Sequence, residues 1–106
     1  MKRTKATLTK ALVTKLQCET VTVIHSAMED SPRTVALVNV EKTLATKEKL
    51  ERAYMLTNSI NDAWYTSDEV EYIGPTKACR STSVGDMVRL ENGKKFKCEP
   101  AGWSEI

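Results

Sequence analysis

Two segments rich in β-branched residues lie close together in the first half of the chain and constrain its fold more than any other feature. Residues 20–27 (TVTVIHSA) and 34–41 (TVALVNVE) both favour strands, because branched side chains pack well on a pleated surface. The stretch Glu29-Asp30-Ser31-Pro32 between them is typical of a turn. Because residues 34–41 are apolar on nearly both faces, we expect a central strand that is covered on both sides.

A helix is predicted to follow these strands. Thr46 is a suitable N-cap, and the helix is expected to run to about Asn58, where polar side chains compete with the backbone for hydrogen bonds. Its buried side is marked by residues at helical spacing, namely Leu50, Ala53, Tyr54, Thr57 and Ile60. Near the N-terminus, residues 6–17 carry a second apolar stripe. That stripe predicts either a short amphipathic helix or an extended arm, since threonines lower helix propensity.

The C-terminal third is predicted to be a β-hairpin whose register depends on its loop. A two-residue turn at Asn92-Gly93 would pair Val88 with Lys97, which mixes apolar and charged residues on one face. A three-residue loop over 91–93 instead pairs Val88 with Phe96. The solvent side then receives the pairs Met87 with Lys97 and Arg89 with Lys95. One-sided burial sets register more strongly than turn preference, so we expect the longer loop, with Gly93 in the left-handed region.

These elements together predict an α+β fold. We expect a small, mostly antiparallel sheet with one main helix (about 46–58), a C-terminal β-hairpin and, in one reading, a short N-terminal helix. Further strands are expected at 69–73, before the break at Gly74-Pro75, and around Trp103. With 106 residues and no linker or repeat, residues 1–106 are predicted to be a single domain in which residues 1–17 form a basic arm or a short helix.

The composition is that of a globular protein of a reducing compartment. Hydrophobic residues make up 41% and charged residues 28%, and no apolar run approaches the roughly 20 residues that span a bilayer. Cys18, Cys79 and Cys98 are scattered and odd in number, which argues against a disulfide framework. We therefore expect a cytoplasmic protein without membrane contact.

No catalytic, metal-binding or cofactor motif is recognisable. His25 is the single histidine, and alternation places it on one strand face with Val21 and Val23, as expected for a hydrogen-bonded structural histidine. An enzyme that uses Cys79 and His25 remains the alternative, because sequence does not show spatial adjacency and Arg80 follows Cys79. The prediction is a non-enzymatic protein with no cofactor and no metal.

The most distinctive stretch is RSTSVGD at 80–86, which leads into the hairpin. Its hydroxyls, guanidinium, glycine and carboxylate suit a recognition loop that presents backbone N–H groups to an anion. Its candidate binding residues are Arg80, Ser81, Ser83, Gly85 and Asp86. The alternative is a structural turn in which Ser83 and Asp86 bond nearby amides and Gly85 takes positive φ.

Residues 50–106 carry a resemblance to a known group of proteins. The segment TNSI at 57–60 followed by Trp64, then RSTSVGD at 80–86 and Gly102-Trp103, resembles small proteins of phages and mobile elements and, more distantly, YodL-like domains. Met87 stands where valine is usual and Trp103 where phenylalanine is usual. The resemblance implies a phage or plasmid accessory protein that acts inside a bacterium, and it supplies no catalytic residue. Together with the small size and the missing catalytic constellation, it leads us to expect a protein that binds a host protein in the cytoplasm of an infected bacterium. It adds Asn58 and Trp64 to the candidate binding residues.

Uneven charge suggests a second function. Nucleic-acid binding would use a basic N-terminal arm and the hairpin, through Lys2, Arg3, Lys5, Lys10, Lys15, Arg89, Lys95 and Lys97. Aromatic residues make up only 6%, which leaves little for base stacking.

A homodimer that hides an open sheet edge is a further expectation.

Overall fold

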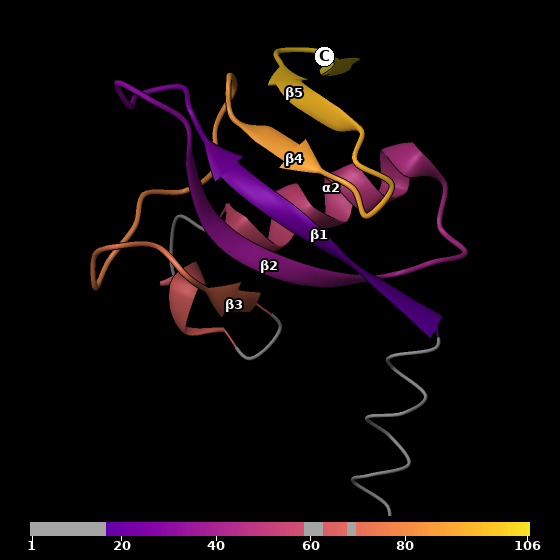
Figure 1. Ribbon diagram of the computed structural model, residues 1–106, viewed down its shortest axis with the longest axis horizontal. Helices are drawn as coiled ribbons and strands as arrows, with labels where there is room; N and C mark the ends of the chain where they lie inside the picture. Colours follow the sequence, from indigo (N-terminus) through magenta and orange to yellow (C-terminus); the bar gives the residue numbers. More distant parts are fainter. Residues whose placement is uncertain (1–16, 59–62, 68–69) are drawn as a thin grey trace, which may run out of the picture.

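The computed structural model describes residues 17–58, 63–67 and 70–106. They form a six-stranded antiparallel sheet in the order β3-β2-β1-β4-β5-β6, with helix α2 against one face (Figure 1). The elements in chain order are β1 (Cys18–His25), β2 (Arg33–Glu41), α2 (Thr46–Thr57), the 3₁₀-helix η1 (Trp64–Thr66), β3 (Val70–Tyr72), β4 (Met87–Arg89), β5 (Lys95–Glu99) and β6 (Gly102–Glu105). The predicted α+β fold, with its one main helix, is confirmed.

The two predicted N-terminal strands are present and pair with each other. β2 begins one residue before its predicted start, whereas β1 begins two residues early and ends at His25. The strand stops there because the amides of Ser26 and Ala27 donate hydrogen bonds to the carboxylate of Asp86 instead of continuing the ladder. The end of β1 is thus set by a residue sixty positions away in the sequence.

The sheet has one core face and one open face. The core face presents Val21, Val23, Ala36, Val38 and Val88. Leu50 and Ala53 of α2 and Trp64 of η1 belong to the same core cluster. On the opposite side of β2, Leu37 is half-buried and Asn39 is exposed. The expectation that this strand is covered on both sides is therefore wrong. Its apolar composition reflects instead an interior place in the sheet, between β3 and β1, while the helix lies on one face (Figure 1).

Helix α2 differs from its prediction at one end. Thr46 is its first helical residue, and Ala45 holds the N-cap position without a side-chain hydrogen bond, so the expected Thr46 cap is wrong. The buried stripe is as expected, because Leu50, Ala53 and Thr57 face the core. The helix ends one residue before Asn58.

The hairpin adopts the predicted register. Val88 pairs with Phe96, and the flanking pairs are Met87 with Lys97 and Arg89 with Lys95. Gly93 has φ of 90°. Its N–H donates to the Leu90 carbonyl, and the Leu90 N–H donates to the Lys94 carbonyl. This is the three-residue loop with a glycine bulge that one-sided burial favours.

The remaining strands form the two edges of the sheet. β3 is shorter than its expected range of 69–73, and β6 contains Trp103 as expected. The stripe predicted over 6–17 falls almost wholly outside the described residues, as does Ile60. No helix within the described ranges combines the length and apolar character that crossing a membrane requires.

Candidate functional site

The candidate site forms around a buried carboxylate at the start of β4. Asp86 is fully buried, and its Oδ1 accepts the amides of Ser26 and Ala27 at 2.9 Å each, while its Oδ2 accepts the amide of Ser83 at 2.7 Å. Burial alone would raise the pKa of Asp86. Hydrogen bonds from Arg80 and these amides outweigh it and lower the pKa to about 2. The carboxylate is therefore ionised at neutral pH.

Arg80 joins this carboxylate to a second one. Its Nη1 and Nη2 donate to the two oxygens of Asp86 at 2.7 and 2.9 Å, and its Nε and Nη2 donate to Glu29 at 3.2 and 2.8 Å. The Asp86 hydrogen bond is the main cause that raises the pKa of Arg80, and the Arg80 hydrogen bonds lower the pKa of Glu29. The guanidinium thus clamps the β1–β2 loop to the loop over 80–86.

His25 lies beside the clamp and begins a chain of hydrogen bonds. It is 1% exposed, and its Nε2 lies 3.0 Å from the Thr82 hydroxyl. That hydroxyl donates to Thr57, whose own hydroxyl donates to the Ala53 carbonyl. Because the Thr82 proton is used in this way, Thr82 must accept from His25, which assigns the ring proton to Nε2 and leaves Nδ1 as an acceptor. Burial lowers the pKa of His25, so the ring is neutral.

Cys79 completes the chain of hydrogen bonds at the free ring nitrogen. Its Sγ lies 3.6 Å from His25 Nδ1, so the thiol donates to the imidazole. Burial raises the pKa of the Cys79 thiol, and the nearby guanidinium only partly offsets this rise. A cysteine–histidine pair therefore exists, as one alternative from the sequence requires. Both members are neutral, whereas reactive cysteines depend on the thiolate.

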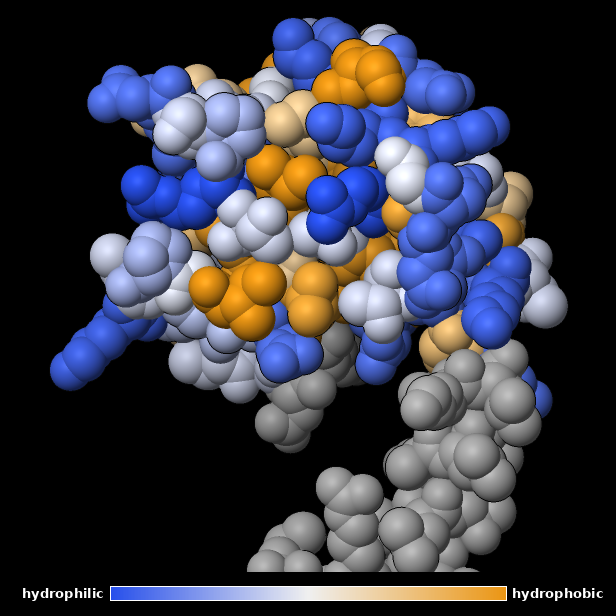
Figure 2. Space-filling model, viewed as in Figure 1, coloured by the Kyte–Doolittle hydropathy of each residue, from blue (hydrophilic) through white to orange (hydrophobic). Residues whose placement is uncertain are grey.

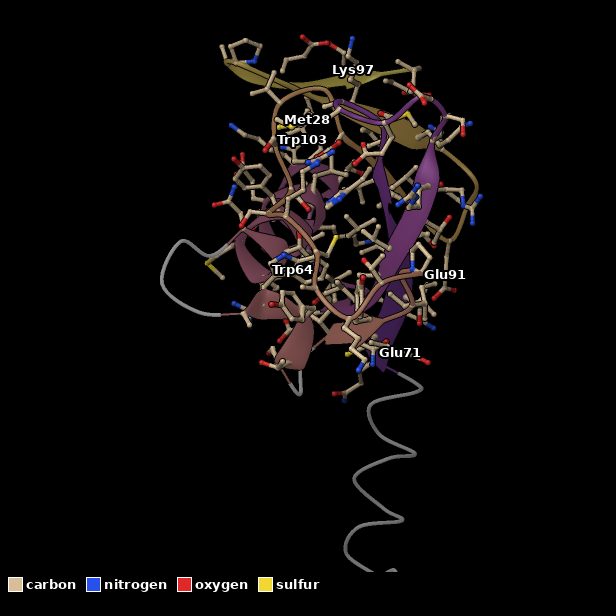
Figure 3. All side chains as sticks on the ribbon, turned by 90° about the vertical axis from the view of Figure 1, so that its left-hand side faces the viewer. Met28, Trp64, Glu71, Glu91, Lys97 and Trp103 are labelled. Carbon is tan, nitrogen blue, oxygen red and sulfur yellow. The ribbon has the colours of Figure 1, made fainter. Side chains whose placement is uncertain are left out.

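The other predicted binding residues form hydrogen bonds to backbone carbonyls of the loop over 80–86. The Trp64 indole donates to the Arg80 carbonyl at 3.0 Å, and the Asn58 amide donates to the Thr82 carbonyl at 2.6 Å. The Trp64 side chain is buried in the core; it is labelled in Figure 3. The Ser83 hydroxyl donates to the Ser81 carbonyl at 3.3 Å. The structure thus brings all seven residues into one cluster, and the contacts described for them are internal to the chain.

Gly85 has the positive φ that was predicted for it if the loop is a structural turn. Its φ is 96°, and a Cβ placed on it would lie 2.9 Å from the Cβ of Ala27. The loop presents one amide, that of Ser83, to an anion, and the other two amides come from Ser26 and Ala27 of the β1–β2 loop. The anion that they bind is the chain's own Asp86. Within the described ranges, no three His, Cys, Asp or Glu side chains lie close enough together to hold a metal ion.

The residues predicted to bind nucleic acid fall into two groups, one within the described residues and one outside them. Arg89, Lys95 and Lys97 come together on the open face. Lys2, Arg3, Lys5, Lys10 and Lys15 lie outside the described residues.

A surface that the sequence did not single out lies beside the cluster, around Trp103 in β6. Two hollows of about 250 and 440 Å³ flank this half-buried indole, between α2 and the β5–β6 turn. The smaller one is lined by Val84, Tyr54, Glu51, Glu99, Pro100 and Gly102, among others. The Tyr54 ring meets the Trp103 ring edge-on at 6.3 Å between centroids. One signal was in the sequence, because Val84 is the only apolar side chain within RSTSVGD, and it is 48% exposed.

The chain was compared with family models, curated proteins and solved structures. No family model, curated protein or solved structure matches it. The class that fold and site define is a small α+β domain whose polar cluster is a buried clamp and whose apolar hollows lie beside it.

Proposed function

We propose that this chain is a non-enzymatic accessory protein of a phage or mobile element that binds a host protein in the bacterial cytoplasm. We assign to the partner the surface formed by the two hollows that flank Trp103, and we call this surface the groove. One observation carries the proposal. Arg80 pairs with both Asp86 and Glu29, whereas Val84, in the same loop, is exposed and lines this groove.

The groove has the character of a binding surface. Tryptophan and tyrosine contribute a large share of the binding energy at protein interfaces. Here Trp103 and Tyr54 pack edge-on against each other, and aromatic side chains have few rotatable bonds to order on binding. The Asp86–Arg80 pair fixes the loop that carries Val84, so that wall of the groove is preorganised.

Charge at the rim narrows the chemistry of the partner. The smaller hollow has two carboxylates in its lining, Glu51 and Glu99, and no basic residue. The larger hollow is lined by Lys47 and by no acid. A complementary segment therefore brings an apolar side chain to contact Trp103 and a lysine or arginine that faces the smaller hollow. The resemblance of residues 50–106 to phage proteins supports a bacterial host as the source of this segment.

Site-specific photo-crosslinking tests the assignment. A photoreactive residue in place of Val84 should give one dominant adduct in host cells, and the same residue in place of exposed Lys77 should not. Glu51→Lys should weaken formation of the adduct by at least tenfold, because it reverses the charge of the rim. Equal adducts from both positions, or an adduct indifferent to Glu51→Lys, would contradict the proposal.

One observation favours the enzyme alternative, namely the contact between Cys79 and His25. Two facts oppose it. The thiol pKa is raised by burial, and the His25 ring is tied at its other nitrogen to Thr82. The hollows described above lie along α2 and beside Trp103, and neither Cys79 nor His25 lines them.

A further inference from the structure

Three cationic side chains gather on the open face of the sheet, opposite the helix. Arg89 of β4 lies directly opposite Lys95 of β5, and Lys97 follows two residues along β5. All three are exposed. Side chains of directly opposed residues start only about 5 Å apart, and alternate residues of one strand about 7 Å apart. We call these three residues the basic ladder.

The ladder lacks neutralising partners in the part of the chain that the structure describes. None of its members forms an ion pair with a described residue. Glu91, the acid of the hairpin loop, instead accepts the amide of Thr20. Glu99 lies two residues beyond Lys97 and is half-buried. Like charges placed directly opposite each other destabilise a sheet, so the ladder costs the fold stability.

The surroundings of the ladder are suited to an extended ligand. The cross-strand row through Arg89 continues over Thr22 and Leu37 to Glu71 at the far edge. Figure 2 views this face and shows hydrophilic side chains over β4 and β5, with apolar ones among them and toward β2. In Figure 3, Glu71 lies at the opposite end of the molecule from Lys97. The negative charge of this row is thus kept away from the ladder.

We propose that the basic ladder binds the sugar–phosphate backbone of a nucleic acid. Its charges are spaced closely enough to meet successive or alternate phosphates of one strand, which carry a charge about every 3.4 Å. The described residues in its row are aliphatic, hydroxyl-bearing or acidic, so base stacking has no aromatic platform there. Contact with the backbone alone makes the binding independent of base sequence.

This site is independent of the groove beside Trp103. The ladder and the helix lie on opposite faces of the sheet, so a nucleic acid and a host protein can bind at once. The chain would then tether its host partner to nucleic acid. Loss of one activity leaves the other measurable, so the two proposals fail separately.

Salt dependence of binding tests the ladder. Fluorescence anisotropy of the full chain with a labelled single strand and with a duplex is measured from about 50 to 200 mM salt, where each neutralised phosphate contributes about 0.7–0.9 to the slope of log affinity against log salt. The variant with Arg89→Gln, Lys95→Gln and Lys97→Gln should lose about 2 from the slope on single strands and almost 3 on duplexes. At the lower salt concentration it should bind at least tenfold more weakly.

Matched controls separate the ladder from net charge and from other polyanions. Lys47→Gln removes one exposed charge from α2, on the other face, and should leave the slope unchanged. An unchanged slope in the triple variant, or an equal loss with Lys47→Gln, overturns the proposal. So does polyglutamate that competes as well as DNA at equal charge, because the ligand would then be an acidic polypeptide.

Discussion

Replacing Asp86 with asparagine removes the charge at the centre of the clamp while keeping its size. The fall of the Asp86 pKa from 3.8 to about 2 is worth about 2 kcal/mol of stability at neutral pH, since a tenfold change in proton affinity corresponds to about 1.4 kcal/mol. The asparagine NH₂ must also face either an amide or Arg80, all of which are donors. Asp86→Asn should therefore lower the free energy of unfolding by about 2–4 kcal/mol.

The pH dependence gives this prediction a signature. Because the folded-state pKa is lowered, the contribution of Asp86 is present above pH 3.8 and is lost as pH falls toward about 2. His25 acts in a higher window. Its pKa is also lowered, so the unfolded chain takes up the proton first, and stability begins to fall below pH 6.5. The variant should lack the lower loss. Its upper loss should be at least as large as in the wild type, because the Asp86 charge, 3.8 Å from His25 Nε2, opposes the lowering of the His25 pKa by burial.

Urea unfolding followed by tryptophan fluorescence from about pH 7 down to about pH 2 measures both effects. Asp30→Asn is the matched control, since Asp30 is exposed in the β1–β2 loop that the clamp holds. If Asp86→Asn unfolds within about 0.5 kcal/mol of the wild type and with the same acid profile, the clamp does not stabilise the fold and this reasoning is refuted.

Three further outcomes are expected. Gly85→Ala should cost about 1–3 kcal/mol in urea unfolding, more than Gly93→Ala, because both have positive φ but only Gly85 has a neighbour within 3 Å of the added Cβ; equal costs would count against it. Lys95→Gln should raise the free energy of unfolding by about 0.2–0.5 kcal/mol by relieving repulsion with Arg89, and a loss would show that the pair is not repulsive. Cys79 should react with iodoacetamide at pH 8 more slowly than glutathione, and faster labelling would point to an activated thiolate.

Local patterns in the sequence predicted the strands, helix α2 and one register, but not the 3₁₀-helix η1. Alternation of Val88 with its charged neighbours chose the three-residue hairpin loop over the two-residue turn, because a slip by one residue would have buried lysines. The β-branched runs predicted β1 and β2, and the helical stripe predicted α2. Each of these three patterns involves only residues that are close together in the sequence. The same local reasoning misplaced the helix cap by one residue and supposed a second cover over β2.

The assembly of the site was decided only by tertiary structure. RSTSVGD showed which residue types were present, but not that Asp86 would occupy the anion position offered by its own loop and by Ser26 and Ala27. The contact between His25 and Cys79 joins positions 54 residues apart. Contacts between residues so far apart in sequence depend on which strands pair in the sheet. A short motif carries no information about which distant N–H group will donate to it. The sequence by itself therefore determined the strands and the helix, while the packing of the β1–β2 loop against residues 79–86 determined which groups are satisfied and which surface is left for a partner.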